Sequence, residues 1–198
     1  MKNNSKVLFG GLTGSDAVEG AIKLAKFVTK RHVVVAFENS YHGQTTAALS
    51  VTSIRKYKDL YDPLGPEVHF VPYSYCYRCS FKLEYPECDM RCFTYLEHIL
   101  EYPYSGIEKP AAIIIEPIQG EEGVRVPPPG FLKKVEKLAR DNNVLLIVDE
   151  IQPGMGRTGT WFACEHDGIV PDTITMAKSI GGIGLPLAAI MYRKELKP

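Results

Sequence analysis

The sequence lacks the features that direct a chain to membranes, nucleic acids or the secretory pathway. No apolar stretch approaches the length of a membrane-spanning helix, and residues 1–6 lack the apolar core of a signal peptide. Lysine plus arginine and aspartate plus glutamate both number 23, so the basic excess typical of nucleic-acid-binding domains is missing. We therefore expect a cytoplasmic protein with neither a membrane nor a nucleic-acid partner.

Cysteine is also scarce, with five residues in a chain of 198. An odd number without a secretory signal argues against a disulfide framework and favours reduced thiols or a metal site. Four of the five lie in the irregular insertion 73–92, as Cys76, Cys79, Cys88 and Cys92. This spacing is compatible with tetrahedral zinc, which would staple the insertion and make it a candidate interaction module. The alternative is four reduced, partly buried thiols.

The remaining composition is that of an ordinary globular domain, with 45% hydrophobic and 23% charged residues. Short apolar runs predict buried strands at 33–37, 68–71, 111–115 and 144–148. Apolar residues at helical spacing predict helices at 16–28, 44–52, 93–101 and 131–139. Because strands and helices alternate, we expect an α/β fold of three layers, with a mainly parallel sheet and helices on both faces.

A glycine-containing turn precedes the first predicted helix, at Thr13-Gly14-Ser15-Asp16. Asp16 followed three residues later by Glu19 fits a capping box, so this helix is expected to begin near Asp16. A helix N-terminus of this kind offers free backbone N–H groups and a positive dipole end, which suit an anion such as phosphate. The alternative is an ordinary junction between a loop and a helix.

Further polar groups follow the predicted strands, and in an open α/β sheet such strand ends form the ligand site. They are Tyr41 and His42, Glu116, and Asp149 with Gln152, while Lys178 follows a further apolar segment. Pyridoxal phosphate needs these parts: a helix N-terminus, a stacking ring, a carboxylate for its pyridine nitrogen and a lysine for its aldehyde.

The same motifs occur in one known family in this order. They span 147–159, 171–172 and 177–182, with support from 13–19, 41–43 and 116–121. With them the chain resembles the large domain of the class III (fold type I) pyridoxal-phosphate-dependent aminotransferases, the relatives of 4-aminobutyrate, acetylornithine and ornithine aminotransferases. The resemblance implies the fold type I architecture, a homodimer, and amino acids and 2-oxo acids as substrates.

The resemblance also implies roles for individual residues. Lys178 would form the Schiff base and shuttle a proton from a desolvated position that lowers its pKa. Asp149 would pair with the pyridinium nitrogen, and both residues are the expected catalytic groups. The other expected cofactor ligands are Gly14 and Ser15 at the phosphate, Tyr41 and His42 at the ring, and Gln152 near the phenolic oxygen. Glu116 and Glu121 are expected on the substrate side, with Glu116 also close to the cofactor.

The implied reaction is transfer of an amino group from an ω-amino or related amino acid to a 2-oxo acid. One alternative is an amino-acid racemase of the same family, which uses the same lysine. Another is a catalytically incomplete fragment, because residues 1–198 match the large domain without the family's N-terminal segment and C-terminal small domain. Gln44 stands where many acetylornithine and 4-aminobutyrate enzymes carry arginine, so neither substrate is assigned.

Overall fold

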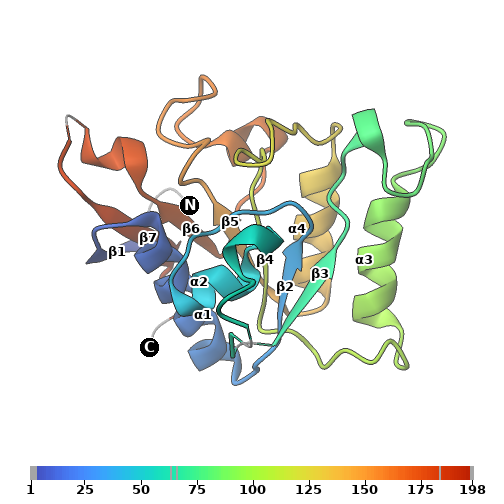
Figure 1. Ribbon diagram of the computed structural model, residues 1–198, viewed down its shortest axis with the longest axis horizontal. Helices are drawn as coiled ribbons and strands as arrows, with labels where there is room; N and C mark the ends of the chain where they lie inside the picture. The colour runs from blue at the N-terminus through green and yellow to red at the C-terminus, as the bar shows by residue number, and fades with distance from the viewer. Residues whose placement is uncertain (1–3, 63, 66, 183, 197–198) are drawn as a thin grey trace.

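A seven-stranded sheet forms the centre of the computed structural model, which describes residues 4–62, 64–65, 67–182 and 184–196 (Figure 1). In chain order its strands are β1 (Ser5–Gly11), β2 (Val34–Phe37), β3 (Val68–Val71), β4 (Ala112–Ile115), β5 (Leu145–Asp149), β6 (Thr173–Met176) and β7 (Ala188–Arg193). In space they lie in the order β1-β7-β6-β5-β4-β2-β3.

Five neighbouring strands, from β3 through β6, run parallel, and β7 pairs antiparallel with both β6 and β1. The prediction of a mainly parallel sheet is therefore confirmed. Sequence analysis predicted neither β6 nor β7 as a strand, although Gly181, Gly182, Gly184 and Pro186 mark a turn just before the apolar run of β7. The parallel register brings the carboxyl ends of β2, β4, β5 and β6 to one edge of the sheet, where polar side chains from distant segments meet.

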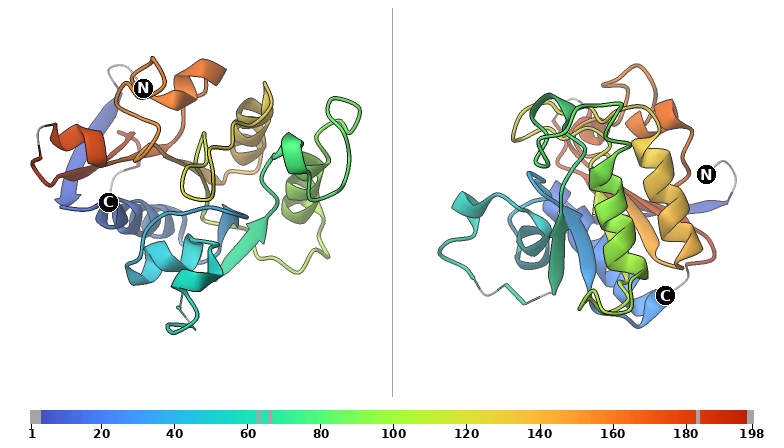
Figure 2. Two further views of the ribbon diagram at one scale, coloured as in Figure 1. Left: turned by 45° about the horizontal axis from the view of Figure 1, so that its top comes forward. Right: turned by 90° about the vertical axis from the view of Figure 1, so that its right-hand side faces the viewer.

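Helices cover both faces of the sheet, as predicted. On one side lie α1 (Gly14–Thr29) and α2 (Thr46–Val51), and on the other α3 (Arg91–Glu101) and α4 (Phe131–Asp141). The right panel of Figure 2 shows the sheet between these two helix layers. Short 3-10 helices complete the elements: η1 (Arg55–Tyr57), η2 (Cys76–Arg78), η3 (Ala163–Asp167) and η4 (Lys178–Gly181).

Strand β2 shows why the central strands are apolar throughout. Val34 and Ala36 pack in the core beneath α1 and α2, whereas Val35 and Phe37 pack in the core beneath α3 and α4. Successive side chains of a strand point to opposite faces, so a strand covered on both faces needs apolar residues at every position. The buried runs recognised in the sequence are therefore the centre of a three-layer fold.

The start of α1 differs from the prediction. Thr13, rather than Asp16, is the N-cap: its side chain accepts the Asp16 N–H, and the Asp16 carboxylate accepts the Thr13 N–H at 2.8 Å. Glu19 takes no part in this capping box. Its carboxylate instead accepts hydrogen bonds from the Thr45 hydroxyl and from the backbone N–H groups of Ala47 and Ala48. Glu19 thus caps α2, which the sequence spacing alone could not indicate.

The carboxylate of Glu150 is fully buried directly after β5. It accepts the backbone N–H groups of Ala163 at 3.0 Å and Cys164 at 2.8 Å. Burial raises the pKa of Glu150, and the hydrogen bonds to Cys164 and Ala163 partly oppose that rise. The side chain therefore links the end of the central strand to η3, and holds the intervening loop against the sheet.

Replacing Glu150 with alanine should destabilise the fold by about 2 kcal/mol or more, because two buried N–H groups would lose their acceptor. Urea unfolding of the purified chain measures the change. Glu165→Ala is the matched control, since Glu165 is an exposed acid in the same 3-10 helix. Equal unfolding midpoints for the two variants would contradict the role of Glu150 as a link.

Candidate active site

A pocket of about 330 Å³ opens at the carboxyl edge of the parallel strands, a size suited to a small-molecule ligand. Its walls come from five places: the N-terminus of α1 and the segments that follow β2, β4, β5 and β6. Residues lining it are Leu12, Thr13, Gly14, Ser15, Tyr41, His42, Gly43, Glu116, Asp149, Ile151, Gln152, Pro153, Ala177 and Lys178. Every predicted cofactor ligand is in this group, as is Glu116.

Asp149 is the most constrained acid of the pocket. It lies at the end of β5 with 3% of its surface exposed. Its Oδ2 lies 2.7 Å from His42 Nδ1, while Oδ1 accepts the Thr175 hydroxyl at 3.0 Å and the Ile151 N–H at 3.1 Å. Neighbouring strands pair Asp149 with Thr175 in register, which explains that contact. The carboxylate is thus held in one orientation at the pocket wall.

His42 is buried beside Asp149, and its surroundings favour the imidazolium. Burial by itself would lower the pKa of His42, but the hydrogen bond to Asp149 and the charges of Asp149 and Glu116 outweigh burial and raise the pKa above its usual value. The backbone N–H of His42 donates to the Thr52 hydroxyl at 2.9 Å, so the backbone of this residue is held in place as well. A group whose surroundings favour its positive form therefore stands behind the carboxylate of Asp149.

The N-terminus of α1 forms a narrow cradle with the segment after β2. Ser15 Oγ accepts the backbone N–H of Gln44 at 3.1 Å, so the hydroxyl proton of Ser15 remains available to another acceptor. Gly43 has a φ of +125°, and a Cβ at this position would lie 2.2 Å from Ser15 Oγ. Only glycine fits there. Together with the unpaired N–H groups of a first helical turn, these atoms are suited to bind an anion.

Lys178 begins η4 directly after β6 and has a φ of +48°, in the left-handed region that non-glycine residues rarely adopt. Its Nζ donates to Gln152 Oε1 at 3.4 Å. The side chain is exposed, because it extends into the open pocket, and its desolvation beside a bound cofactor stays a prediction. Its backbone is nonetheless anchored at the end of a buried strand.

Gln152 lies between Lys178 and a loop that follows β4. A Cβ built on Gly120 of that loop would lie 2.3 Å from Gln152 Oε1, so the loop backbone packs closely against the side-chain amide of Gln152. Gly120 is therefore a second glycine that the pocket requires. The sequence contained no specific signal for this contact, since Gly120 and Gln152 are distant in the chain.

The two glutamates expected on the substrate side lie in different environments. Glu116 lines the pocket beside Asp149 and accepts the Tyr41 N–H at 3.1 Å. Glu121 is exposed and is not among the pocket-lining residues; its carboxylate accepts the Tyr57 hydroxyl at 3.4 Å. The Tyr57 ring in turn packs edge-on against Tyr41, with 5.5 Å between ring centroids. Tyr57 was missed by sequence analysis because it lies in an irregular segment.

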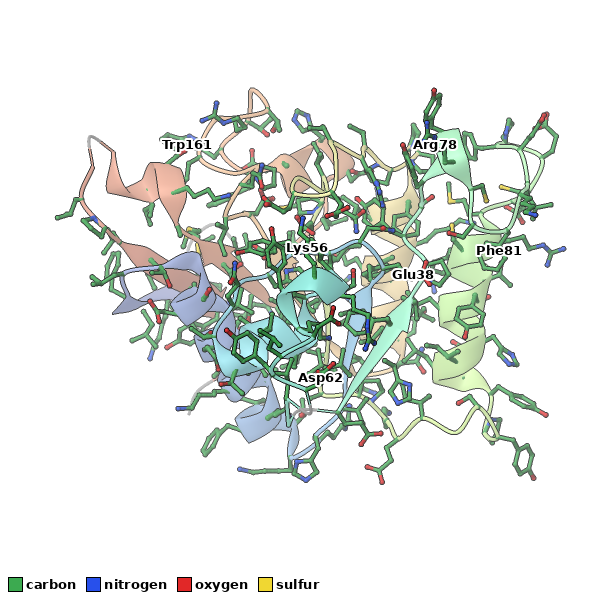
Figure 3. All side chains as sticks on the ribbon, in the orientation of Figure 1. Glu38, Lys56, Asp62, Arg78, Phe81 and Trp161 are labelled. Atoms are coloured by element: carbon green, nitrogen blue, oxygen red, sulfur yellow. The ribbon has the colours of Figure 1, made fainter. Side chains whose placement is uncertain are left out.

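The cysteine insertion forms a separate feature, away from the pocket. Cys76, Cys79, Cys88 and Cys92 line one small cavity of about 20 Å³, and Figure 3 shows sulfur atoms gathered between the labelled Arg78 and Phe81. Within the described residues, however, no group of three or more His, Cys, Asp or Glu side chains is arranged to hold a metal ion. The expectation of a zinc site, and of a zinc-stapled module, is not supported by this arrangement.

Burial raises the pKa of the Cys76 and Cys92 thiols, and the hydrogen bond from Ser74 only partly opposes that rise. Cys79, Cys88 and Cys92 are partly buried, as the alternative of reduced thiols expects, whereas Cys76 is exposed.

Across the described part of the chain, no helix combines the length and apolar character needed to cross a membrane.

The chain is 43% identical over 196 residues to a diaminobutyrate–2-oxoglutarate aminotransferase of Rhizobium meliloti, and the match covers 99% of this chain and 42% of that protein. It is 44% identical over 192 residues to a leucine/methionine racemase of Thermococcus litoralis, covering 96% and 42% respectively. The chain thus spans about two fifths of the length of these curated relatives.

A solved structure with the same fold is the amine transaminase from an uncultivated Pseudomonas species in its pyridoxal-phosphate-bound form. It superposes with a TM-score of 0.87 at 30% identity and covers 96% of this chain and 44% of that one. The model of the family described as aminotransferase class-III matches residues 1–197. Its members depend on pyridoxal phosphate. The chain therefore belongs to the class III aminotransferase family.

Proposed function

We propose that residues 1–198 form the large, cofactor-binding domain of a pyridoxal-phosphate-dependent aminotransferase that transfers an amino group from an amino acid to a 2-oxo acid. One observation carries the proposal: Lys178, the Asp149 carboxylate and the N-terminus of α1 face the same pocket. An amine, a ring-nitrogen partner and an anion cradle are the groups that this cofactor requires. The curated relatives are more than twice as long, so we assign the activity to the whole protein that contains this domain.

The donor set of the pocket fits the cofactor at each of its polar groups. Gly14 and Ser15, at the α1 N-terminus, would hold the phosphate through backbone N–H groups and the Ser15 hydroxyl. Asp149, backed by His42, would accept the proton-bearing ring nitrogen, and Tyr41 would cover the ring face. Gln152 would donate from its amide to the phenolic oxygen, since its Oε1 is engaged by Lys178.

When bound, pyridoxal phosphate supplies an aldehyde that reacts with amines and a ring that accepts the electron pair of a broken Cα–H bond. Lys178 supplies the nucleophilic amine for that aldehyde. Once a substrate amine has displaced it, Nζ would take the proton from the substrate Cα and pass it to the cofactor carbon that carried the aldehyde. Asp149 would keep the ring nitrogen protonated, because a carboxylate beside that nitrogen favours its positive form.

Racemisation is a second candidate function, favoured by the 44% identity to the leucine/methionine racemase of Thermococcus litoralis. Racemisation returns the proton to the same carbon, so it needs no 2-oxo acid, whereas transamination consumes one. Incubating the holoenzyme with a single amino-acid enantiomer, with and without 2-oxoglutarate, separates the two reactions by chiral chromatography.

We also propose a cytoplasmic homodimer, as the family resemblance implies. The exposed apolar side chains of the edge strand β1 support a self-association surface: Val7, Leu8 and Phe9 are 49%, 51% and 61% exposed. Apolar groups this exposed on an edge strand favour a covering partner.

Lys178→Ala should abolish the covalent adduct that forms when the chain is mixed with pyridoxal phosphate and reduced with borohydride. The adduct requires a primary amine at this position of the pocket. Peptide mapping by mass spectrometry locates the modification. Lys137→Ala, which removes an exposed lysine of α4, is the control and should keep the adduct. Modification of other lysines with Lys178 untouched would overturn the assignment.

Gly43→Ala should weaken binding of pyridoxal phosphate about tenfold or more, because the added Cβ must displace Ser15 and strain the backbone. Pyridoxal, which lacks the phosphate, should lose much less affinity. Fluorescence titration with both compounds measures the ratio. Gly10→Ala is the control, since nothing lies within 4 Å of a Cβ there. Equal losses for both compounds would argue against a phosphate cradle at Ser15.

Asp149→Asn should destabilise the chain more in mild acid than in mild alkali. The raised pKa of His42 means that its ion pair with Asp149 contributes fully below the unfolded pKa of about 6.5. That contribution is lost as the pH rises through the folded pKa, so the difference between wild type and variant should shrink. Urea unfolding across this pH range measures it, with the exposed Asp141→Asn as control. A difference that grows with pH would contradict the ion pair.

A further inference from the structure

Glu116 connects two walls of the pocket that are far apart in the sequence. Its Oε2 accepts the backbone N–H of Tyr41, from the segment after β2, at 3.1 Å. Its Oε1 accepts the backbone N–H of Gly120, from its own loop, at 3.3 Å. The side chain is 5% exposed, so water does not compete for these contacts. One carboxylate therefore binds the backbone on both sides of the pocket.

The two backbone N–H groups that donate to Glu116 belong to residues that position other groups of the pocket. The Tyr41 N–H belongs to the residue whose ring lines the pocket as the candidate stacking surface. Gly120 has no room for a Cβ, because Gln152 Oε1 would lie 2.3 Å from it, and the same oxygen accepts from Lys178 Nζ. A shift of Gly120 therefore moves Gln152, and a shift of Tyr41 moves the ring.

The buried charge of Glu116 stands in an unfavourable setting. Burial, together with the like charge of Asp149, raises its pKa to about 7, although His42 and the two backbone N–H groups oppose the rise. The charged groups around it are His42 from the segment after β2, Asp149 from β5 and, across the pocket, Lys178 of η4. Such a buried acid is retained where its two oxygens satisfy backbone N–H groups, as those of Glu150 do after β5.

We propose that Glu116 is a positioning residue: its carboxylate holds the Tyr41 ring and the Gly120–Gln152 wall at the separation that admits the flat ring of the cofactor. The inference rests on the proposed function and deepens it. To the expected place of Glu116 near the substrate and the cofactor it adds a specific role in supporting the walls of the cofactor pocket. Glu116 acts through Tyr41 and Gln152 and need not touch the substrate.

The variant Glu116→Gln isolates the double-acceptor property. A carboxylate offers an acceptor oxygen to each N–H group, whereas an amide offers one oxygen and presents its NH₂ to the other N–H. One buried donor then loses its partner at nearly unchanged side-chain volume. Glu116→Asp keeps both oxygens but shortens the reach by one methylene, and serves if the first variant folds poorly. Glu122→Gln is the matched control, an acid of the same loop whose only recorded partner in the described structure is Lys56.

The first arm of the experiment uses the chain without cofactor and measures backbone amide hydrogen exchange by NMR. Glu116→Gln should speed exchange at the Tyr41 or Gly120 amide about tenfold or more, with other core amides unchanged.

The second arm titrates pyridoxal phosphate and records the circular dichroism of the bound cofactor. Glu116→Gln should bind about tenfold more weakly and show a reduced signal, because the ring is held less rigidly. Glu122→Gln should match the wild type in both arms.

The two arms separate failure of this inference from failure of the proposed function. Unchanged exchange at both amides, or wild-type affinity and dichroism in a variant whose amides do exchange faster, would overturn the positioning role. Absence of any adduct at Lys178 in the wild type would overturn the proposed function, while the exchange arm would still decide whether Glu116 holds the two amides.

Discussion

The buried contact between His42 and Asp149 is the constraint on which the rest of the site depends. Asp149 ends β5 and His42 follows β2, and β4 lies between these two strands in the sheet. A 2.7 Å bond from Nδ1 to Oδ2 joins the two ends above β4. Because both partners are almost fully buried, neither can turn to water without leaving the other unsatisfied. This pair fixes how the Tyr41 segment and the Asp149 segment face each other.

Elsewhere in the fold, three glutamates accept hydrogen bonds from backbone N–H groups outside the sheet. Glu19 binds the N–H groups that begin α2, Glu116 binds those of Tyr41 and Gly120, and Glu150 binds those of Ala163 and Cys164. Segments beyond the strand ends have no neighbouring strand to satisfy their backbone, so they need other acceptors. An ionised carboxylate offers two oxygens and can hold two such groups at once. Segments beyond the strand ends are therefore held in part by acidic side chains, of which Glu116 and Glu150 are buried.

Local patterns were sufficient for most of the elements. Apolar runs predicted the parallel strands β2, β3, β4 and β5, because strands covered on both faces need apolar residues throughout, as in β2. Spacing failed where a residue has its partner far away in the chain. Asp16 and Glu19 fit a capping box by spacing, yet Thr13 holds the cap and Glu19 reaches α2. The cysteine spacing permitted zinc, yet the four side chains are not arranged to hold a metal.

The sequence by itself determined the general alternation of strands and helices, the family, and a group of expected cofactor ligands that all line the pocket. Periodicity and motif order depend on residues that are near one another in the chain, so they can be recognised in the sequence alone. Only the tertiary structure decided that Glu116 lies beside Asp149 while Glu121 points outside, that Gly43 touches Ser15 and Gly120 touches Gln152, and that Lys178 is exposed. These contacts join segments separated by tens of residues, and the packing of the sheet together with buried side-chain hydrogen bonds sets which of them meet.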